Sequence, residues 1–352
     1  MKQSPGGVRN FASQGELITT IIPTYRRPDR LKKAIQSVLD QTHPHVQVCV
    51  YDNSSSDETA EVVAAFIQKD LRVKYHCHAK DIGAGENFQY GLSHVKTPFF
   101  SFLSDDDFLL PEFYETALKG FERYPEAAFS LGAVIDVNDE GEVVDVSLAK
   151  WPDREYYTPP DGLLEMIGKY SNWIGTLFRQ DVIGRIGPLD LALKAIDVDF
   201  MFRAAAQLPF AISKKPCAVF VQHAASYSGH HGLKLIWPGW PVMIEKLTAN
   251  RLLGQEAKQM VEQKLLVDLQ TRLLMNALRS LERNKIDEAA SIAELYYQHS
   301  SKKKLKKMLS ITIKTCRMLP PTQKLIVFLL KVRRFWLRRV QKAHLQTAYR
   351  NL

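Results

Sequence analysis

The chain has 352 residues, of which 45% are hydrophobic and 24% charged, which is ordinary for a soluble globular protein with a full core. Of its 47 basic residues, 15 lie after Glu294, where there is no acidic residue, so the first 294 residues hold 32 basic and 38 acidic groups. An acidic body with a net charge of −6 is therefore expected to carry a basic tail.

From the spacing of the cysteines and the length of the apolar runs, we expect neither a cysteine-based metal site nor a signal peptide or a membrane-spanning helix. The four cysteines are far apart and lack metal-ligand spacing, so buried, reduced thiols are expected. The first fifteen residues lack the apolar run of a signal peptide. No stretch reaches the roughly 18 to 20 continuous apolar residues of a spanning helix. We therefore expect a cytoplasmic body.

Four apolar or β-branched runs in the first third of the chain predict buried strands. They cover residues 17–22, 46–51, 72–77 and 99–103. A helical pattern follows each run, the last beginning at Pro111. Alternation of strands and helices predicts an α/β fold with a doubly wound parallel sheet. In such sheets ligands bind beyond the carboxyl ends of the strands, so the loops at Thr24, Asp52, Gly83 and Asp105 are expected to share one site.

Three consecutive carboxylates, Asp105, Asp106 and Asp107, follow the fourth run. Adjacent carboxylates repel one another, so a fold that holds them at a strand end usually supplies a cation. Their oxygen atoms suit Mg²⁺ or Mn²⁺, which leave coordination positions for substrate phosphates. A solvated acidic turn is the alternative, but the position at the shared edge favours a metal site.

The pattern changes after a helix expected at residues 111–124. Runs at 127–137 and 142–148 flank a turn sequence that ends in Gly141, which predicts a hairpin, and further strands are expected at 172–178 and 210–222. A short helix begins at Asp197, and helices fill the chain from about Val242. We expect a flexible segment 1–16, one body 17–240 with a mixed sheet, and an all-α basic extension 241–352.

Five segments resemble motifs of the inverting family 2 glycosyltransferases. They are Ile21–Arg27, Tyr51–Thr59, Gly83 with Asn87, Leu103–Asp107 with Pro111, and Asp197–Asp199 with Arg203. The chain departs from the usual pattern in its second loop, at Glu86 where Arg is common, at Ser104, and in lacking Glu before Asp197. The resemblance covers residues 17–222 and none of the tail. Because all five motifs occur in the order typical of that family, the resemblance is strong.

The resemblance implies a GT-A fold and transfer of a sugar from a nucleoside diphosphate sugar, with UDP expected, to a hydroxyl of a glycan or lipid-linked acceptor. Synthesis of cell-surface polysaccharide or glycoconjugate is the expected setting. Asp197 would be the general base, with a role as helix N-cap as an alternative or addition. The implied metal ligands for Mn²⁺ or Mg²⁺ are Asp106, Asp107 and His223. The implied nucleotide-sugar site comprises Pro23, Thr24, Tyr25, Arg27, Asp52, Asn53, Gly83, Asn87, Ser104, Asp105 and Asp106.

Simpler roles remain open for several of these side chains. Asp52 could be a turn residue that bonds its own loop, and Arg203 a structural residue. Trp173 could belong to the core instead of the acceptor side. His223 and the histidines that follow it could be a surface cluster without function instead of a loop over the donor.

The tail carries a basic stretch at 301–308 and, after Pro320–Pro321, an apolar face from Leu325 to Val340 opposite a basic one. This pattern is typical of an interfacial helix on anionic lipid, which would hold the protein at the inner face of the membrane. Packing on the body or in a homo-oligomer is the alternative. Nucleic acid is not expected, because no recognition motif accompanies the charge.

Two other functions were weighed against sugar transfer. A sugar nucleotidyltransferase usually has a glycine-rich phosphate loop after its first strand, and Pro23–Arg27 contains no glycine. A non-catalytic membrane-associated scaffold of the same fold would have no need of all the carboxylates at Asp52, Asp105–Asp107 and Asp197.

Overall fold

The computed structural model describes residues 17–169, 173–223 and 239–318, together with Lys324, Phe328, Leu329 and Val332. The expectations for residues 1–16, for the histidines after His223 and for most of the tail helix lie outside these residues. The chain divides into two compact units. One comprises Met1–Glu142 and Val146–His223, and the other comprises Val143–Asp145 and Ala224–Leu352.

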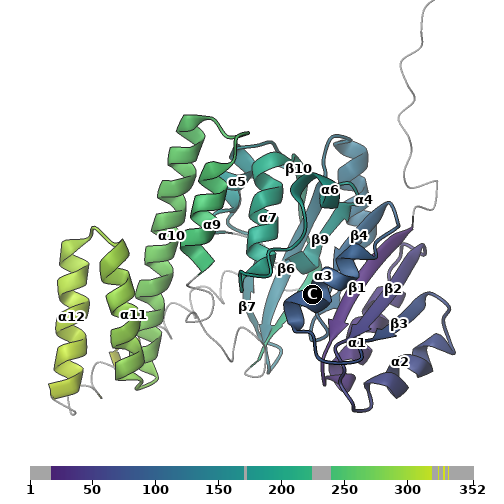
Figure 1. Ribbon diagram of the computed structural model, residues 1–352, viewed down its shortest axis with the longest axis horizontal. Coiled ribbons are helices and arrows are strands. Elements are labelled where there is room, and N and C mark those ends of the chain that lie inside the picture. The colour runs from purple at the N-terminus through teal and green to yellow at the C-terminus, as the bar shows by residue number, and fades with distance from the viewer. Residues whose placement is uncertain are drawn as a thin grey trace, which may run out of the picture. The chain divides into compact units, whose positions relative to one another are not determined.

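Four parallel strands and the helices between them form the first half of the sheet, as predicted (Figure 1). The strands lie in the order β3-β2-β1-β4. Their bounds are β1 (Ile18–Thr24), β2 (Val46–Asp52), β3 (Val73–Cys77) and β4 (Phe99–Phe102), and the helices are α1 (Pro28–Leu39), α2 (Thr59–Ile67) and α3 (Ala84–Ser93). The continuous apolar runs arise because β1 and β4 are buried along their whole length.

Strand β1 does not end before Pro23, as the sequence suggested, but continues through it to Thr24. The amide of Leu103 donates to the carbonyl of Ile21, so Ile21 and, two residues on, Pro23 face the β4 side. The pairing of β1 with β4 has already ended there, at Ile21 and Phe102. Pro23 therefore has no partner in β4, and its lack of an N–H group costs the sheet no hydrogen bond.

The second half adds mixed strands to the same sheet, so the expected single α/β sheet is confirmed. In the described part of the chain the order continues from β4 through β9, β6 and β10 to β5, with β7 beside β6 and β8 beside β10. The strands are β5 (Phe108–Leu109), β6 (Phe129–Asn138), β7 (Val143–Val146), β8 (Tyr156–Tyr157), β9 (Thr176–Arg179) and β10 (Phe210–Gln222). The helices are α4 (Phe113–Arg123), α5 (Asp161–Met166), α6 (Val182–Ile186) and α7 (Ile196–Gln207).

Aromatic side chains fill the core behind the end of β4. Phe100 stacks on Phe178 of β9 at 5.0 Å, and Phe102 lies 6.0 Å from Phe200 of α7, edge to face. Trp173 stacks on Phe102 at 4.2 Å and is buried, so it belongs to the core. The strand expected from residue 172 begins only at Thr176, because Trp173–Gly175 form a 3₁₀ turn. This core holds α7 against the strand that carries the acidic loop.

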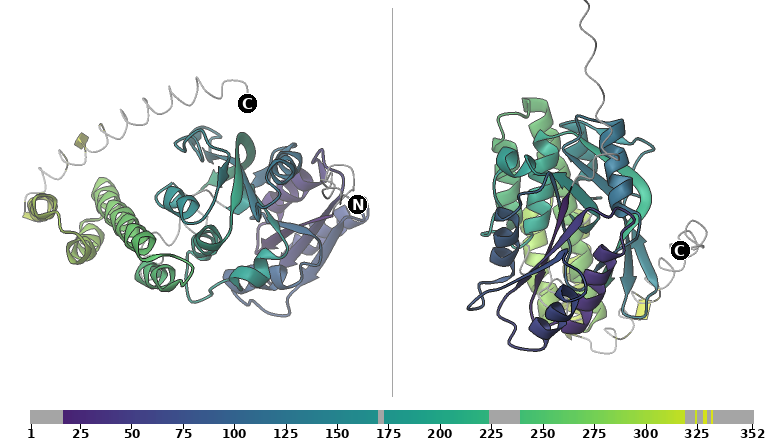
Figure 2. Two further views of the ribbon diagram at one scale, coloured as in Figure 1. Left: turned by 90° about the horizontal axis from the view of Figure 1, so that it is seen from above. Right: turned by 90° about the vertical axis from the view of Figure 1, so that its right-hand side faces the viewer.

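Apart from Val143–Asp145 of β7, the described residues of the second unit are helical, as predicted from about Val242 onward. Its helices are α9 (Gly239–Ala249), α10 (Gln255–Glu282), α11 (Ile286–His299) and α12 (Lys303–Met318). Val261, Leu265, Leu269 and Leu273 recur every four residues of α10 and are buried. Figure 2 shows α10, α11 and α12 side by side, in green to yellow. Among the residues that the structure describes, no helix combines the length and the apolar character that crossing a membrane requires.

The cysteines are free thiols, and three of them are buried as expected. Cys77 is exposed, because it ends β3 at the edge of the sheet. Burial raises the pKa of the Cys217 thiol to about 12, so this thiol stays protonated at neutral pH.

Candidate active site

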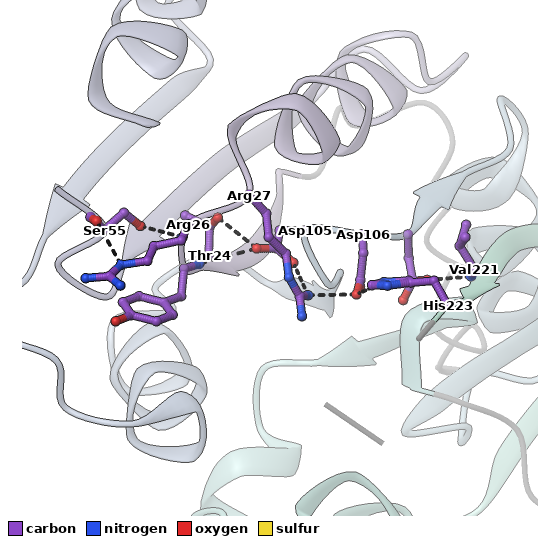
Figure 3. Close-up of polar contacts among 10 residues, drawn as sticks. Thr24, Arg26, Arg27, Ser55, Asp105, Asp106, Val221 and His223 are labelled. Atoms are coloured by element: carbon purple, nitrogen blue, oxygen red, sulfur yellow. Dashed lines mark hydrogen bonds and ion pairs between the residues drawn. The ribbon is translucent and has the colours of Figure 1, made fainter. Parts of the chain in front are cut away.

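The loops after β1, β2 and β4 meet at one edge of the sheet (Figure 3). Thr24 Oγ1 donates to Asp105 Oδ2 at 2.8 Å, and the amide of Tyr25 donates to the same oxygen at 3.3 Å. The amide of Arg26 donates to Ser55 Oγ at 2.8 Å. The sheet topology therefore brings together polar residues that are up to 81 positions apart in the sequence.

An acidic cluster with two basic partners lies at the centre of this edge. Arg27 Nη1 lies 3.0 Å from Asp105 Oδ1 and 2.7 Å from Asp106 Oδ2. His223, at the end of β10, places Nε2 2.9 Å from the same Asp106 oxygen. Figure 3 shows this chain of contacts from Thr24 to His223. The structure thus brings together five of the predicted site residues, namely Thr24, Arg27, Asp105, Asp106 and His223.

Burial changes the proton affinity of this cluster. It raises the pKa of Asp105 to about 6, although Arg27 acts in the opposite direction. Burial, reinforced by the neighbouring Asp106, also raises the pKa of Asp107. For Arg27, burial lowers the pKa, but the attraction of Asp105 and Asp106 outweighs it and the pKa is raised. Neighbouring carboxylates in a dry site need a cation to stay ionised.

Asp107 points to a different partner. Its Oδ1 accepts a hydrogen bond from the amide of Val221 at 2.9 Å, and this bond ties the acidic loop to β10. Its Oδ2 is buried without a hydrogen-bond partner among the described residues. Ser104 closes the same loop, since its carbonyl accepts the amide of Asp107 at 3.2 Å. Metal ligation by Asp107 stays a prediction.

Asp106 and His223 fit a partly open site for a divalent cation. Asp106 Oδ2 and His223 Nε2 are 2.9 Å apart, an oxygen and an imidazole nitrogen close enough to bind one ion. His223 Nδ1 is buried with no partner in the part of the chain described, so the ring could carry its proton there. The described residues contain no group of three His, Cys, Asp or Glu arranged to hold a metal. Phosphate oxygens and water would have to supply the remaining ligands, as Mg²⁺ and Mn²⁺ sites allow.

The Asp52 carboxylate is already bonded within the protein. Its Oδ1 accepts from the amide and the hydroxyl of Ser55, at 3.0 and 2.5 Å, and its Oδ2 accepts from Tyr75 Oη at 2.6 Å. These contacts match the alternative of a turn residue. Its predicted contact with the nucleotide is not excluded by them, because each carboxylate oxygen accepts more than one bond. Sequence analysis missed Tyr75, which lies inside a strand pattern and gives no local signal.

Asn53 and Gly83 order the neighbouring loop before α3. Asn53 Nδ2 donates to Asp81 Oδ1 at 2.5 Å, and Asn53 Oδ1 accepts the amide of Ile82 at 2.8 Å. Gly83 is the N-cap residue of α3 and has φ of +93°, which favours glycine. Its amide donates to Asp81 Oδ1 at 2.8 Å. Asp81, also missed from the sequence, is therefore the residue that joins the two loops.

Asn87 lies one turn into α3 and is buried. Its Nδ2 donates to the carbonyl of Tyr51 at 2.8 Å, and its Oδ1 lies 3.0 Å from His78 Nε2. The first contact holds α3 against the end of β2, and the second holds it against the residue that follows β3. In contrast, the Tyr25 side chain is 38% exposed, with the Arg26 guanidinium 4.9 Å from its ring centre. Tyr25 is thus accessible to a ligand, whereas Asn87 has a structural role and positions α3 at the edge of the sheet that carries the site.

Asp197 lies in the first turn of α7, whose N-cap residue is Ala195. The prediction that Asp197 is itself the N-cap is therefore wrong, because the helix begins one residue before it. Burial raises the pKa of Asp197, and the backbone amides of the helix start oppose that rise. A Cβ atom on Gly85 would lie 3.9 Å from Ile196 Cδ1, so the start of α7 lies against the start of α3. The helix turn that carries Asp197 is therefore next to the start of α3.

Asp199 and Arg203 form a buried ion pair on α7, with Arg203 Nε 2.7 Å from Asp199 Oδ2. Arg203 also donates to the carbonyls of Ile186 and Pro188. The pair anchors the segment between α6 and α7. A structural role for Arg203, one of the two open alternatives, matches these contacts.

Residues 19–183 match the family model described as Glycosyl transferase family 2. Protein CgeD of Bacillus subtilis is 31% identical over 139 residues, which cover 37% of this chain and 32% of that protein. The GalNAc(5)-diNAcBac-PP-undecaprenol beta-1,3-glucosyltransferase of Campylobacter jejuni is 36% identical over 94 residues, or 26% of this chain and 30% of that protein. The chain thus spans about a third of the length of these relatives.

Two solved structures are similar in fold. S. aureus TarS 1–349 in complex with UDP-GlcNAc has a TM-score of 0.59 at 17% identity, over 80% of this chain and 92% of that one. Mannosyltransferase PcManGT from Pyrobaculum calidifontis, in complex with GDP-Man and Mn²⁺, has a TM-score of 0.52 at 16% identity, over 92% and 88%. At these identities the likeness concerns the fold alone, which is the GT-A fold implied by the sequence.

Proposed function

We propose that the chain is a metal-dependent inverting glycosyltransferase that uses a nucleoside diphosphate sugar, with UDP as the expected nucleotide. The match of residues 19–183 to the model for Glycosyl transferase family 2 supports this proposal. The observation that carries the proposal is the convergence of Asp105, Asp106 and His223 at the carboxyl ends of the strands. The similar fold of TarS, solved with UDP-GlcNAc, and of PcManGT, solved with GDP-Man and Mn²⁺, supports it.

In the proposed site, Asp106 and His223 would hold Mg²⁺ or Mn²⁺. When bound, the cation would stabilise the negative charge that develops on the leaving diphosphate. Asp105 is fixed by Thr24 and the amide of Tyr25, so it can accept from a ribose hydroxyl or support the metal. The exposed ring of Tyr25 and the backbone from Pro23 would form one wall for the base.

Asp197 serves as the general base for inversion. The acceptor oxygen bonds to the anomeric carbon while the bond from that carbon to the phosphate oxygen breaks, and the nucleoside diphosphate leaves with the electron pair. The acceptor hydroxyl proton passes to the Asp197 carboxylate. The raised pKa of Asp197 suits this role, because a partly buried carboxylate holds the transferred proton better than a fully exposed one.

A panel of donors tests the proposed reaction. The purified chain with Mn²⁺ is incubated with UDP-, GDP- and dTDP-sugars, and release of the nucleoside diphosphate is measured. We expect release from a UDP-sugar above that from the other donors. Formation of a sugar nucleotide and pyrophosphate from sugar phosphate and nucleoside triphosphate would indicate a nucleotidyltransferase instead. No turnover with any donor, together with membrane binding, would indicate a scaffold.

We further propose that the acceptor is lipid-linked and that the helical unit meets an anionic membrane surface. On α12, Leu309, Ile313 and Cys316 are buried, whereas Lys307, Ile311, Lys314 and Met318 share the exposed face. Ile311 is 54% and Met318 67% exposed. A basic face with exposed apolar side chains fits anionic headgroups. The name of the Campylobacter jejuni relative, which includes PP-undecaprenol, supports a lipid-linked acceptor.

The variant Lys307→Glu/Lys314→Glu is expected to bind anionic vesicles about thirtyfold or more weakly than the unchanged chain, because each basic group near such a surface contributes about 1 kcal/mol. Vesicle sedimentation at low salt measures the binding, which should also weaken as ionic strength rises. The matched control, Lys96→Glu/Lys119→Glu, makes the same charge change at exposed positions of the other unit. Equal losses in both variants, or no sedimentation of the unchanged chain, would exclude this surface.

A further inference from the structure

The oxygen atom that the proposed cation needs is already bonded to a cation of the chain itself. Asp106 Oδ2 contacts Arg27 Nη1 at 2.7 Å and His223 Nε2 at 2.9 Å (Figure 3). The same Arg27 nitrogen reaches Asp105 Oδ1 at 3.0 Å. One guanidinium nitrogen therefore bridges two nearly buried carboxylates, at the place where a divalent cation would bridge the protein and a diphosphate.

We propose that Arg27 is an exchangeable counter-ion: it neutralises Asp105 and Asp106 in the metal-free protein, and a divalent cation must displace it from Asp106 to bind. The inference rests on the proposed metal-dependent function and adds a step to it. Metal binding becomes an exchange of one cation for another.

The need for a counter-ion follows from burial. The side chains of Asp105 and Asp106 are only 6% and 10% exposed, and a buried carboxylate without a partner is costly. A divalent cation on Asp106 Oδ2 would be repelled by a guanidinium that contacts the same oxygen, so each weakens the binding of the other. The two cations therefore compete for one oxygen.

Asp105 is fixed by hydrogen bonds, whereas the Arg27 side chain is partly exposed. Asp105 Oδ2 is held by Thr24 and by the amide of Tyr25. The Arg27 carbonyl accepts the amide of Leu31 at 3.0 Å, so its backbone is fixed at the start of α1. Its side chain, however, is 28% exposed and borders solvent. A displaced guanidinium would remain at the mouth of the site, where it can pair with phosphate oxygens.

Mn²⁺ binding to the full chain without nucleotide tests the exchange, with free Mn²⁺ measured by electron paramagnetic resonance. Arg27→Gln should bind Mn²⁺ about tenfold or more tightly than the unchanged chain, a factor typical of one charged hydrogen bond. Arg30→Gln is the matched control: Arg30 lies one turn along α1 and makes only a 3.7 Å surface pair with Asp139 among the ion pairs described. It should leave the Mn²⁺ affinity unchanged.

Thermal unfolding supplies a readout that does not depend on turnover. Without metal, Arg27→Gln should melt at a lower temperature than the unchanged chain, because two buried carboxylates lose their counter-ion. Saturating Mn²⁺ should remove most of that difference, and Arg30→Gln should show neither effect. The variant Arg27→Lys keeps the positive charge but places it on a more strongly hydrated group. This variant should therefore bind Mn²⁺ more tightly than the unchanged chain, by a smaller factor than Arg27→Gln. It also provides the test if Arg27→Gln does not fold.

An unchanged or weaker Mn²⁺ affinity in Arg27→Gln and Arg27→Lys would overturn the exchange, as would failure of every variant to bind Mn²⁺. The donor panel separates this result from failure of the proposed function. Turnover by the unchanged chain without tighter Mn²⁺ binding by the Arg27 variants refutes the exchange alone. Absence of turnover with every donor refutes the glycosyltransferase, whatever the Mn²⁺ titrations give.

Discussion

Replacing Asp106 by Asn is expected to lower sugar transfer by about a thousandfold. A metal ion in such a site stabilises the developing charge on the leaving group by several kcal/mol, and each 1.36 kcal/mol corresponds to a tenfold change in rate. Asp106 Oδ2 is the oxygen that His223 Nε2 approaches at 2.9 Å, so the substitution removes the carboxylate from the pair that would hold the metal. Release of nucleoside diphosphate at saturating Mn²⁺ measures the effect.

The loss should arise without unfolding. Arg27 keeps its contact with Asp105 in the Asp106→Asn variant, so its melting temperature should stay within a few degrees of the unchanged chain. Asp139→Asn, the same substitution at an exposed position, should retain full activity. Excess chelator should abolish transfer by the unchanged chain, and added Mn²⁺ or Mg²⁺ should restore it. Full activity in excess chelator would contradict the metal assignment.

The sequence predicted the first half of the fold because its strands are buried along their length and so give continuous apolar runs. Strands β5 and β8 could not be found in this way, since each has two residues and exists through pairing with β10. The extension of β1 through Pro23 was missed for a related reason. Whether proline is tolerated depends on where the neighbouring strand ends, and that is set by register between distant segments.

The edge of the sheet that carries the site was predictable, because strand ends and polar loops are both visible in the sequence. The partners of the side chains were not. Asp105, Asp106 and Asp107 are adjacent in the chain, yet they bond to Thr24, to His223 and to the amide of Val221, respectively. These partners come from two other strands, so their choice depends on tertiary register that no local pattern encodes.

Replacing Asp197 by Asn is expected to lower turnover by about a hundredfold or more while leaving donor affinity nearly unchanged, the usual scale for a general base. Asp197 lies in the first turn of α7, and α7 packs through Phe200 on Phe102, the last residue of β4. The substitution preserves the shape of the side chain, and Asn Oδ1 can still accept from the backbone amides of the helix start, so the helix should keep its place. Initial rates over a range of donor concentrations separate turnover from the Michaelis constant.

The pH dependence gives a second test of the same residue. A base acts only when deprotonated, and burial raises the pKa of Asp197 above that of an exposed aspartate. Turnover should therefore fall on the acid side at a higher pH than an ordinary aspartate would give, and the residual turnover of Asp197→Asn should lack this fall. Asp181→Asn, at the start of the short helix α6, serves as the control, because that side chain is 58% exposed. If Asp197→Asn instead weakens donor binding at normal turnover, Asp197 belongs to the nucleotide site, and another group must take the acceptor proton.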